Sequence, residues 1–245
     1  MTEILSNDNL KISVERKSKF KIEFATPSYP IIQSLIKSRI IPGANTDPSY
    51  KSFQFTAHSV KTLEQYLHTY NPSNNIQTNN TIHFAAKLIQ TLSTQLQILM
   101  SINNQTILGY NPKDIIIIND TTPLYIGTEF VVEIDMNNNP ETVILSQPFS
   151  RNDFFVSPEL LEIESLPSSI HYKTSYFSLA CVAIYVLLHG SREFYDEYLQ
   201  RYKHESPQKI ILNYLDNHII KETKLYWLIS RCLVEQPENR AILFI

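Results

Sequence analysis

Glycine is scarce in this sequence, whose 245 residues include only four, at Gly43, Gly109, Gly127 and Gly190. Average usage in globular proteins would give about 17 in a chain of this length. Loops that hold nucleotide phosphates in P-loop and dinucleotide-binding proteins need several glycines close together, because their backbone must approach the phosphate. Four isolated glycines therefore exclude both classes of phosphate site, whatever the fold.

Cysteines and basic residues are also few. The two cysteines, Cys181 and Cys232, belong to no Cys-x-x-Cys pair, and no His-x-x-x-His spacing occurs. Zinc sites commonly show such spacings, so we expect no metal site. Each cysteine lies in an apolar helical pattern, which indicates two buried free thiols in a reducing compartment. With 21 basic and 24 acidic residues the formal net charge is −3, which leaves no basic excess for a nucleic acid partner.

Long apolar runs are absent from the sequence. The first residues do not join a basic stretch to an apolar run, so no signal peptide is predicted. Residues 176–188 carry no charge, but these 13 residues are fewer than the roughly 20 that span a bilayer. A helix that is apolar on all sides is buried on all sides, so this segment is expected to be the central helix of a helical part. We expect a cytoplasmic protein with no membrane partner.

The spacing of apolar residues predicts the remaining elements. Strands are predicted at residues 19–24, 52–57, 115–118, 124–134 and 142–145. Helices are predicted at residues 31–41, 60–70, 82–102, 176–188, 192–204, 207–220 and 222–234, and the whole chain from Ser157 onward is expected to be helical. Polar and turn-forming residues predict loops at residues 43–51, 71–80, 119–123 and 137–140. The fold class expected from this order is α+β.

Five strings resemble motifs of protein kinases, and they occur in that family's order. Residues 62–67 are similar to the helix after the hinge, and residues 112–116 to the second half of the catalytic loop. Residues 157–161 are similar to the Ala-Pro-Glu motif, and residues 177–190 to the buried central helix. Residues 231–240 are similar to the segment that ends in the C-terminal arginine. The resemblance covers residues 52–245 well, and the first 50 residues match only as a shortened small lobe.

The resemblance implies one two-lobed kinase-like domain. Residues 1–58 would form a reduced N-terminal lobe of strands and one helix, and residues 59–245 a mainly helical C-terminal lobe. It also implies a structural ion pair between Glu159 of the Ala-Pro-Glu-like motif and Arg240. A bidentate arginine–carboxylate pair is geometrically specific, so this pair belongs to the architecture rather than to the chemistry.

Kinase catalysis depends on a phosphate loop, a lysine on the phosphates, metal-binding side chains and an aspartate that accepts the hydroxyl proton. In this alignment the catalytic aspartate falls on Gly109, which cannot accept a proton, and no glycine precedes Gly43 to form a phosphate loop. The helix predicted at residues 31–41 contains no acid to pair with the small-lobe lysine. The base, the phosphate loop and the partner of the lysine are all missing.

Three residues are candidates for residual metal or nucleotide contacts. Asp114 falls on the metal-binding asparagine, and Glu129 aligns loosely with the first residue of the Asp-Phe-Gly motif. Lys21, or Lys19 on the same predicted strand, is the candidate for the small-lobe lysine. Each also has a plain structural interpretation: a turn residue, a surface glutamate and a solvated strand face.

The expected function is that of a pseudokinase, a catalytically inactive scaffold that binds a protein partner such as an active kinase. The alternative is a divergent Ser/Thr kinase with weak ATP-dependent phosphotransfer, using Asp114, Glu129 or Asp135 in unconventional roles. We expect no resident cofactor, with weak Mg-ATP binding left open. Residues 131–156 are the first candidate for an interaction surface, and the exposed face of residues 192–220 is the second.

Overall fold

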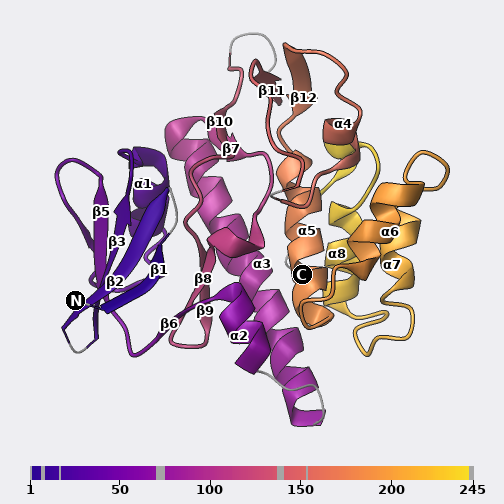
Figure 1. Ribbon diagram of the computed structural model, residues 1–245. Coiled ribbons are helices and arrows are strands. Elements are labelled where there is room, and N and C mark those ends of the chain that lie inside the picture. Colours follow the sequence, from indigo (N-terminus) through magenta and orange to yellow (C-terminus); the bar gives the residue numbers. More distant parts are fainter. Residues whose placement is uncertain are drawn as a thin grey trace.

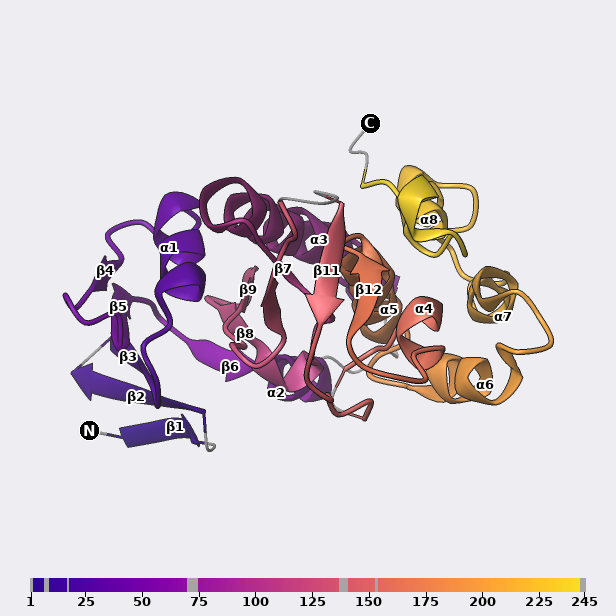
Figure 2. The same ribbon diagram turned by 90° about the horizontal axis from the view of Figure 1, so that it is seen from above.

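The computed structural model describes residues 2–6, 9–16, 18–69, 75–136, 141–152 and 154–242, which form an α+β structure. An N-terminal antiparallel sheet lies at one side of the molecule and most of the helices lie at the other (Figure 1). The view from above shows the same separation, with α1 and α3 between the sheet and the C-terminal helices (Figure 2).

The N-terminal sheet has five antiparallel strands in the order β1-β2-β3-β5-β4. They are β1 (Thr2–Ser6), β2 (Leu10–Arg16), β3 (Lys19–Phe24), β4 (Asn45–Thr46) and β5 (Ser52–Thr56). The predicted strands at residues 19–24 and 52–57 are confirmed, whereas β1, β2 and β4 were not predicted. In β3 the buried side chains of Phe20, Ile22 and Phe24 alternate with more exposed ones, as expected of a sheet with one face on the core.

Helix α1 (Tyr29–Lys37) follows β3 in the chain and buries Ile31, Ile32 and Leu35. It begins earlier than the predicted range because Pro30 lies in its first turn, where a backbone N–H has no partner within the helix. It also ends earlier, at a residue followed closely by Arg39, whose φ of 53° is left-handed. Helix α1 packs against α3 (Asn75–Asn103), so it connects the sheet to the helical part.

For residues 60–80, the predicted helix is confirmed except in its first three residues, whereas the predicted loop is wrong in its second half. The helix expected at residues 60–70 is α2 (Leu63–Thr69), and the residues before it form β6 (Val60–Thr62), whose backbone pairs with β8 (Ile115–Ile118). The loop expected at residues 71–80 is helical in its second half, because α3 begins at Asn75 and no Gly or Pro interrupts the chain there. Residues 71–74 lie outside the described residues.

Short strands surround the loop at residues 108–114. They are β7 (Gln105–Ile107), β8 and β9 (Thr122–Tyr125) and β10 (Val131–Glu133). The run of isoleucines in β8 is fully buried, as predicted. The single strand predicted at residues 124–134 is wrong, because β9 pairs with β8 whereas β10 pairs with β7. The turn predicted at residues 119–123 ends early, since Thr122 and Pro123 belong to β9.

An antiparallel pair of strands, β11 (Thr142–Leu145) and β12 (Ser168–His171), projects at one end of the molecule (Figure 1). Strand β11 was predicted. The expectation that all residues after Ser157 are helical is wrong at β12, because its backbone pairs with β11. The turn predicted at residues 137–140 lies outside the described residues.

The C-terminal helices pack around a buried centre. They are α4 (Pro158–Leu161), α5 (Thr174–Leu187), α6 (Glu193–Arg201), α7 (Pro207–Asn213) and α8 (Lys224–Cys232). Helix α5 is buried along nearly its whole length and packs against both α3 and α8, so its predicted central position is confirmed. Helices α6, α7 and α8 are shorter than predicted. Among the helices that the structure describes, none combines the length and apolar character needed to cross a membrane.

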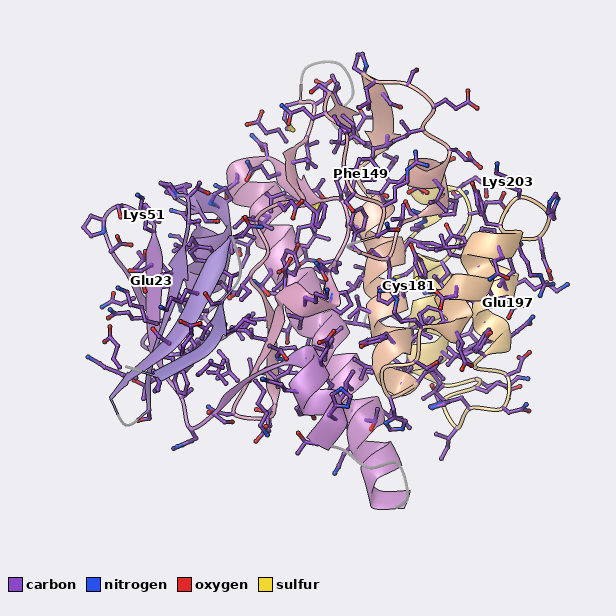
Figure 3. All side chains as sticks on the ribbon, viewed as in Figure 1. Glu23, Lys51, Phe149, Cys181, Glu197 and Lys203 are labelled. Atoms are coloured by element: carbon purple, nitrogen blue, oxygen red, sulfur yellow. The ribbon has the colours of Figure 1, made fainter. Side chains whose placement is uncertain are left out.

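The two cysteines lie inside this helical part as free, buried thiols, and Cys181 is labelled within it in Figure 3. Burial raises the pKa of the Cys181 thiol and raises that of Cys232 to about 12. We therefore expect neither thiol to react with an aromatic disulfide reagent at about pH 8 while the protein is folded. Both thiols should react after unfolding in urea. Rapid labelling of the folded protein would contradict their burial.

Candidate functional site

The loop at residues 108–114 lies between β7 and β8 and is fixed to the central helix. The backbone N–H of Tyr110 donates to the hydroxyl oxygen of Ser178 on α5 at 2.8 Å, and both groups are buried. The side chain of Asn111 accepts a hydrogen bond from the N–H of Lys113 at 3.0 Å, which caps a 3₁₀ turn at Pro112–Asp114. The loop therefore has one defined position relative to α5.

Gly109, the residue aligned with a catalytic aspartate, is buried against an aromatic ring. A Cβ atom added at Gly109 would lie 2.0 Å from Cδ2 of Phe154, far inside van der Waals contact. The Phe154 ring packs in turn against Phe130 and Phe149, with ring centroids 4.5 and 5.9 Å away; Phe149 is labelled in Figure 3. This position thus has neither a carboxylate nor the room for one.

Backbone hydrogen bonds hold the segment that carries Phe154. The N–H of Val156 donates to the Oη of Tyr195 at 2.6 Å, and the Oη of Tyr198 donates to the carbonyl of Val156 at 3.3 Å. Both tyrosines are buried on α6. These bonds fix the backbone two residues after Phe154 to α6.

Gly127, which follows β9, also lies against an aromatic side chain. A Cβ atom at Gly127 would lie 2.4 Å from the Oη of Tyr125 and 2.7 Å from Oδ2 of Asp114. Gly127 is therefore the residue that faces Asp114, whereas Glu129, the candidate from sequence, is exposed. The chain leaves β9 at Tyr125 and reaches Asp114 with Gly127.

Tyr125 carries an unusual buried hydroxyl group. Its side chain is fully buried, and its Oη has no hydrogen-bond partner among the described residues. Burial raises the pKa of Tyr125 well above its ordinary value, and the carboxylates of Asp114 and Glu129 raise it further. An unsatisfied buried hydroxyl costs about 1–3 kcal/mol, so the close packing at Gly127 is maintained against an energetic penalty.

Asp114 is half-buried and fixed through its backbone. Its N–H donates to the carbonyl of Asn111 at 3.0 Å, and its own carbonyl accepts from the N–H of Ile126 at 2.9 Å. These bonds connect the 3₁₀ turn to the chain after β9. Asp114 and Glu129 are the carboxylates near Tyr125, and no group of three or more His, Cys, Asp or Glu residues suited to a metal ion occurs in the described ranges.

Lys21 has a partner on its own strand. Its ammonium lies 2.7 Å from the carboxylate of Glu23, and this hydrogen bond raises the pKa of Lys21. Helix α1, which follows the strand, contains no acidic residue. Lys19 is exposed at the start of β3. The structure thus pairs Lys21 within the sheet rather than with an acid of the following helix.

Glu159 and Arg240 meet in a bidentate ion pair in the C-terminal part. The two guanidinium nitrogens of Arg240 lie 2.6 and 2.9 Å from the two carboxylate oxygens of Glu159. Arg240 is fully buried and also donates to the carbonyls of Val234 and Glu235, at 2.8 and 3.0 Å. Its guanidinium lies 5.3 Å from the ring centroid of Phe177 on α5. One side chain therefore links α4, α5 and the chain after α8.

The structure brings together Asp114, Gly127 and Tyr125, and it leaves Lys21 in a separate ion pair. Asp114, Gly127 and Tyr125 line none of the three cavities described in the structure, although Phe149 lines one of them and Glu159 another. Sequence reasoning missed Phe154 and Tyr125, whose role depends on packing. In comparisons with known proteins, no protein-family model and no curated protein matches this chain.

The buried ion pair makes a stability prediction. Glu159→Ala leaves the Arg240 guanidinium buried without its carboxylate, so the free energy of unfolding should fall by about 3–5 kcal/mol. Arg240→Lys should also destabilise the protein, because an ammonium cannot form the two parallel bonds. Urea unfolding followed by circular dichroism measures both changes. As a control, Glu3→Ala removes the exposed partner of Lys11 and should have little effect. Equal stability of all three variants would contradict this role.

The contact at Gly109 makes a second prediction. Gly109→Ala forces a methyl group into the Phe154 ring and should cost about 1–3 kcal/mol of stability. The same substitution should cost much less in a Phe154→Ala background, where the ring is absent. Urea unfolding of the four proteins in this double-mutant cycle gives the coupling energy.

Gly43→Ala is the matched control for that cycle. A Cβ atom at Gly43 meets nothing within 4 Å, and its cost comes from a φ of 71°. Its effect should therefore be the same with either residue at position 154. If the changes in unfolding free energy of Gly109→Ala and Phe154→Ala are additive, the two positions are not in steric contact.

Proposed function

We propose that this chain is a protein kinase-like protein that has lost phosphotransfer and acts as a protein-interaction scaffold. The order of elements supports the resemblance: an antiparallel sheet with a helix after its third strand precedes a mainly helical part with a buried central helix. The N-terminal sheet ends at Thr56 and β6 begins at Val60, so the proposed boundary between residues 58 and 59 falls between them.

The observation that carries the loss of activity is the closure of the two glycine positions. Phosphotransfer needs an acid that accepts the hydroxyl proton and side chains that hold magnesium. Gly109 provides no acid and is covered by Phe154, and Gly127 faces Asp114 under the Oη of Tyr125. Loss of the base and of a metal ligand should reduce the rate by several orders of magnitude.

The buried ion pair supports a scaffold rather than a decayed chain. Glu159 and Arg240 keep the bidentate geometry that the kinase resemblance implies for these positions. A single lost partner would leave a buried charge, so retention of both preserves the C-terminal framework. A C-terminal framework that keeps this ion pair but lacks the catalytic residues is consistent with a protein that acts by binding.

The segment at residues 131–156 is the proposed binding surface of this scaffold. Met136 and Ile144 are 54% and 52% exposed there, and Leu166, which precedes β12, is 37% exposed. Grouped apolar exposure marks contact surfaces. The face of residues 192–220, with Ile219 at 65% exposure, is the second candidate. A partner such as an active kinase would be regulated through a shift in the population of its states.

Nucleotide binding tests the proposal directly. A ligand at about 100 times its Kd adds roughly 2.7 kcal/mol of stability, which differential scanning fluorimetry detects. We expect no rise in Tm with ATP and Mg²⁺, because position 109 carries no carboxylate and the sequence has no glycine-rich loop for the phosphates. Phosphotransfer to a general protein substrate should be absent as well.

The divergent-kinase alternative makes the opposite prediction. In that case Mg-ATP raises Tm, and Asp114→Ala abolishes both the rise and the phosphotransfer. Lys113→Ala is the matched control, since its side chain is exposed on the same 3₁₀ turn and should leave either result unchanged.

A further inference from the structure

A groove between α3 and α8 lies apart from the candidate site. It has a volume of about 760 Å³. Both helices pack against α5, and their outer faces form its walls. Buried Ile89 and Leu228 contribute to its lining, and the side chain of Trp227 is 54% exposed beside them.

Each wall of the groove is a helical stripe of the same length. On α3 the stripe consists of His83, Ala86, Lys87 and Gln90, and on α8 of Lys224, Trp227, Leu228 and Arg231. In both, the residues are spaced at i, i+3, i+4 and i+7, which places them on one face over about two turns, or roughly 10 Å. Two such stripes facing one groove over buried apolar residues form the kind of surface that receives a third helix.

The charge of the groove has one sign. Lys87, Lys224 and Arg231 line it, and no aspartate or glutamate does among the residues that the structure describes. Neither α3 nor α8 contains an acidic residue, although the whole chain has a net charge of −3. The basic side chains are exposed, whereas Ile89 and Leu228 are buried, so an occupant meets apolar surface below and positive charge at the rim.

We propose that this groove binds an amphipathic helix of a partner protein that carries carboxylates beside its apolar anchors. Trp227 is the expected anchor contact, because exposed tryptophans and arginines contribute much of the binding energy at interfaces. Lys87 and Arg231 select an acidic partner from opposite walls. The biological meaning of this site rests on the proposed scaffold function, but the groove shares no residue with the loop at residues 108–114.

Trp227 is the only tryptophan of the chain, so its fluorescence reports on the groove alone. The probe is a set of synthetic peptides of about 20 residues without tryptophan, with leucines at i, i+3, i+4 and i+7 and flanking glutamates. We expect a saturable blue shift of Trp227 emission on titration. Peptides with lysine in place of each glutamate, and scrambled peptides, should give no shift.

Charge-reversal variants locate the binding site. Lys87→Glu and Arg231→Glu should each weaken the acidic peptide by about tenfold or more, since each loses a charge-assisted contact. Lys51→Glu makes the same change of charge beside the N-terminal sheet, where Figure 3 labels Lys51, and should leave affinity unchanged. Because all three side chains are exposed, matching thermal unfolding curves will show that the fold is intact.

Three titration results would overturn the proposal, and a fourth result follows them. They are no shift with any acidic peptide, equal binding of acidic and lysine-containing peptides, and a shift produced by a single-chain fatty acid but by no peptide. A shift that depends on protein concentration alone would assign the groove to a second copy and also contradict it. None of these results bears on nucleotide binding, so failure here and failure of the proposed function are distinguishable.

Discussion

The contact between Phe154 and Gly109 is the constraint on which the interpretation of the loop at residues 108–114 depends. The ring occupies the space that any side chain at position 109 would need. The backbone of Val156, two residues further on, donates a hydrogen bond to Tyr195 and accepts one from Tyr198 on α6. A side chain at position 109 therefore requires the Phe154 ring to shift.

At Gly127, too, an aromatic side chain fills the space beside a glycine. Tyr125 places a hydroxyl group without a partner against Gly127 and Asp114, in the interior of the protein. Buried polar groups usually find hydrogen bonds, so an exception has a structural or functional reason. Here aromatic side chains fill the space beside both glycines, and the Tyr125 hydroxyl lies close to the Asp114 carboxylate. The binding surfaces proposed above lie elsewhere on the molecule.

Sequence patterns predicted those parts of the fold that depend on local periodicity. Strand β3 and the isoleucines of β8 were found because burial on one or both faces leaves a direct pattern. Strand β6 was predicted as helix because three residues are too few for a period, and only pairing with β8 makes them a strand. The start of α3 was missed because polar residues without Gly or Pro are compatible with both loop and helix.

In the candidate site, too, some contacts were predicted from sequence and others were not. The pair of Glu159 and Arg240 was predicted from motifs, since two matched strings carry it. The positions of Phe154 and Tyr125 have no such signal, because a ring that lies over a glycine leaves no mark in spacing or composition. Glu129 was chosen because Glu129-Phe130 resembles the start of the Asp-Phe-Gly motif, whereas the path of the chain after β9 places Gly127 next to Asp114.

A crystal structure of the protein soaked with ATP and Mg²⁺ is the most direct test of the central claim. We expect Phe154 over Gly109 and Tyr125 against Gly127, with no nucleotide beside Asp114. A bound nucleotide with a cation on Asp114, or a Phe154 ring displaced from Gly109, would contradict a kinase-like framework without catalytic function.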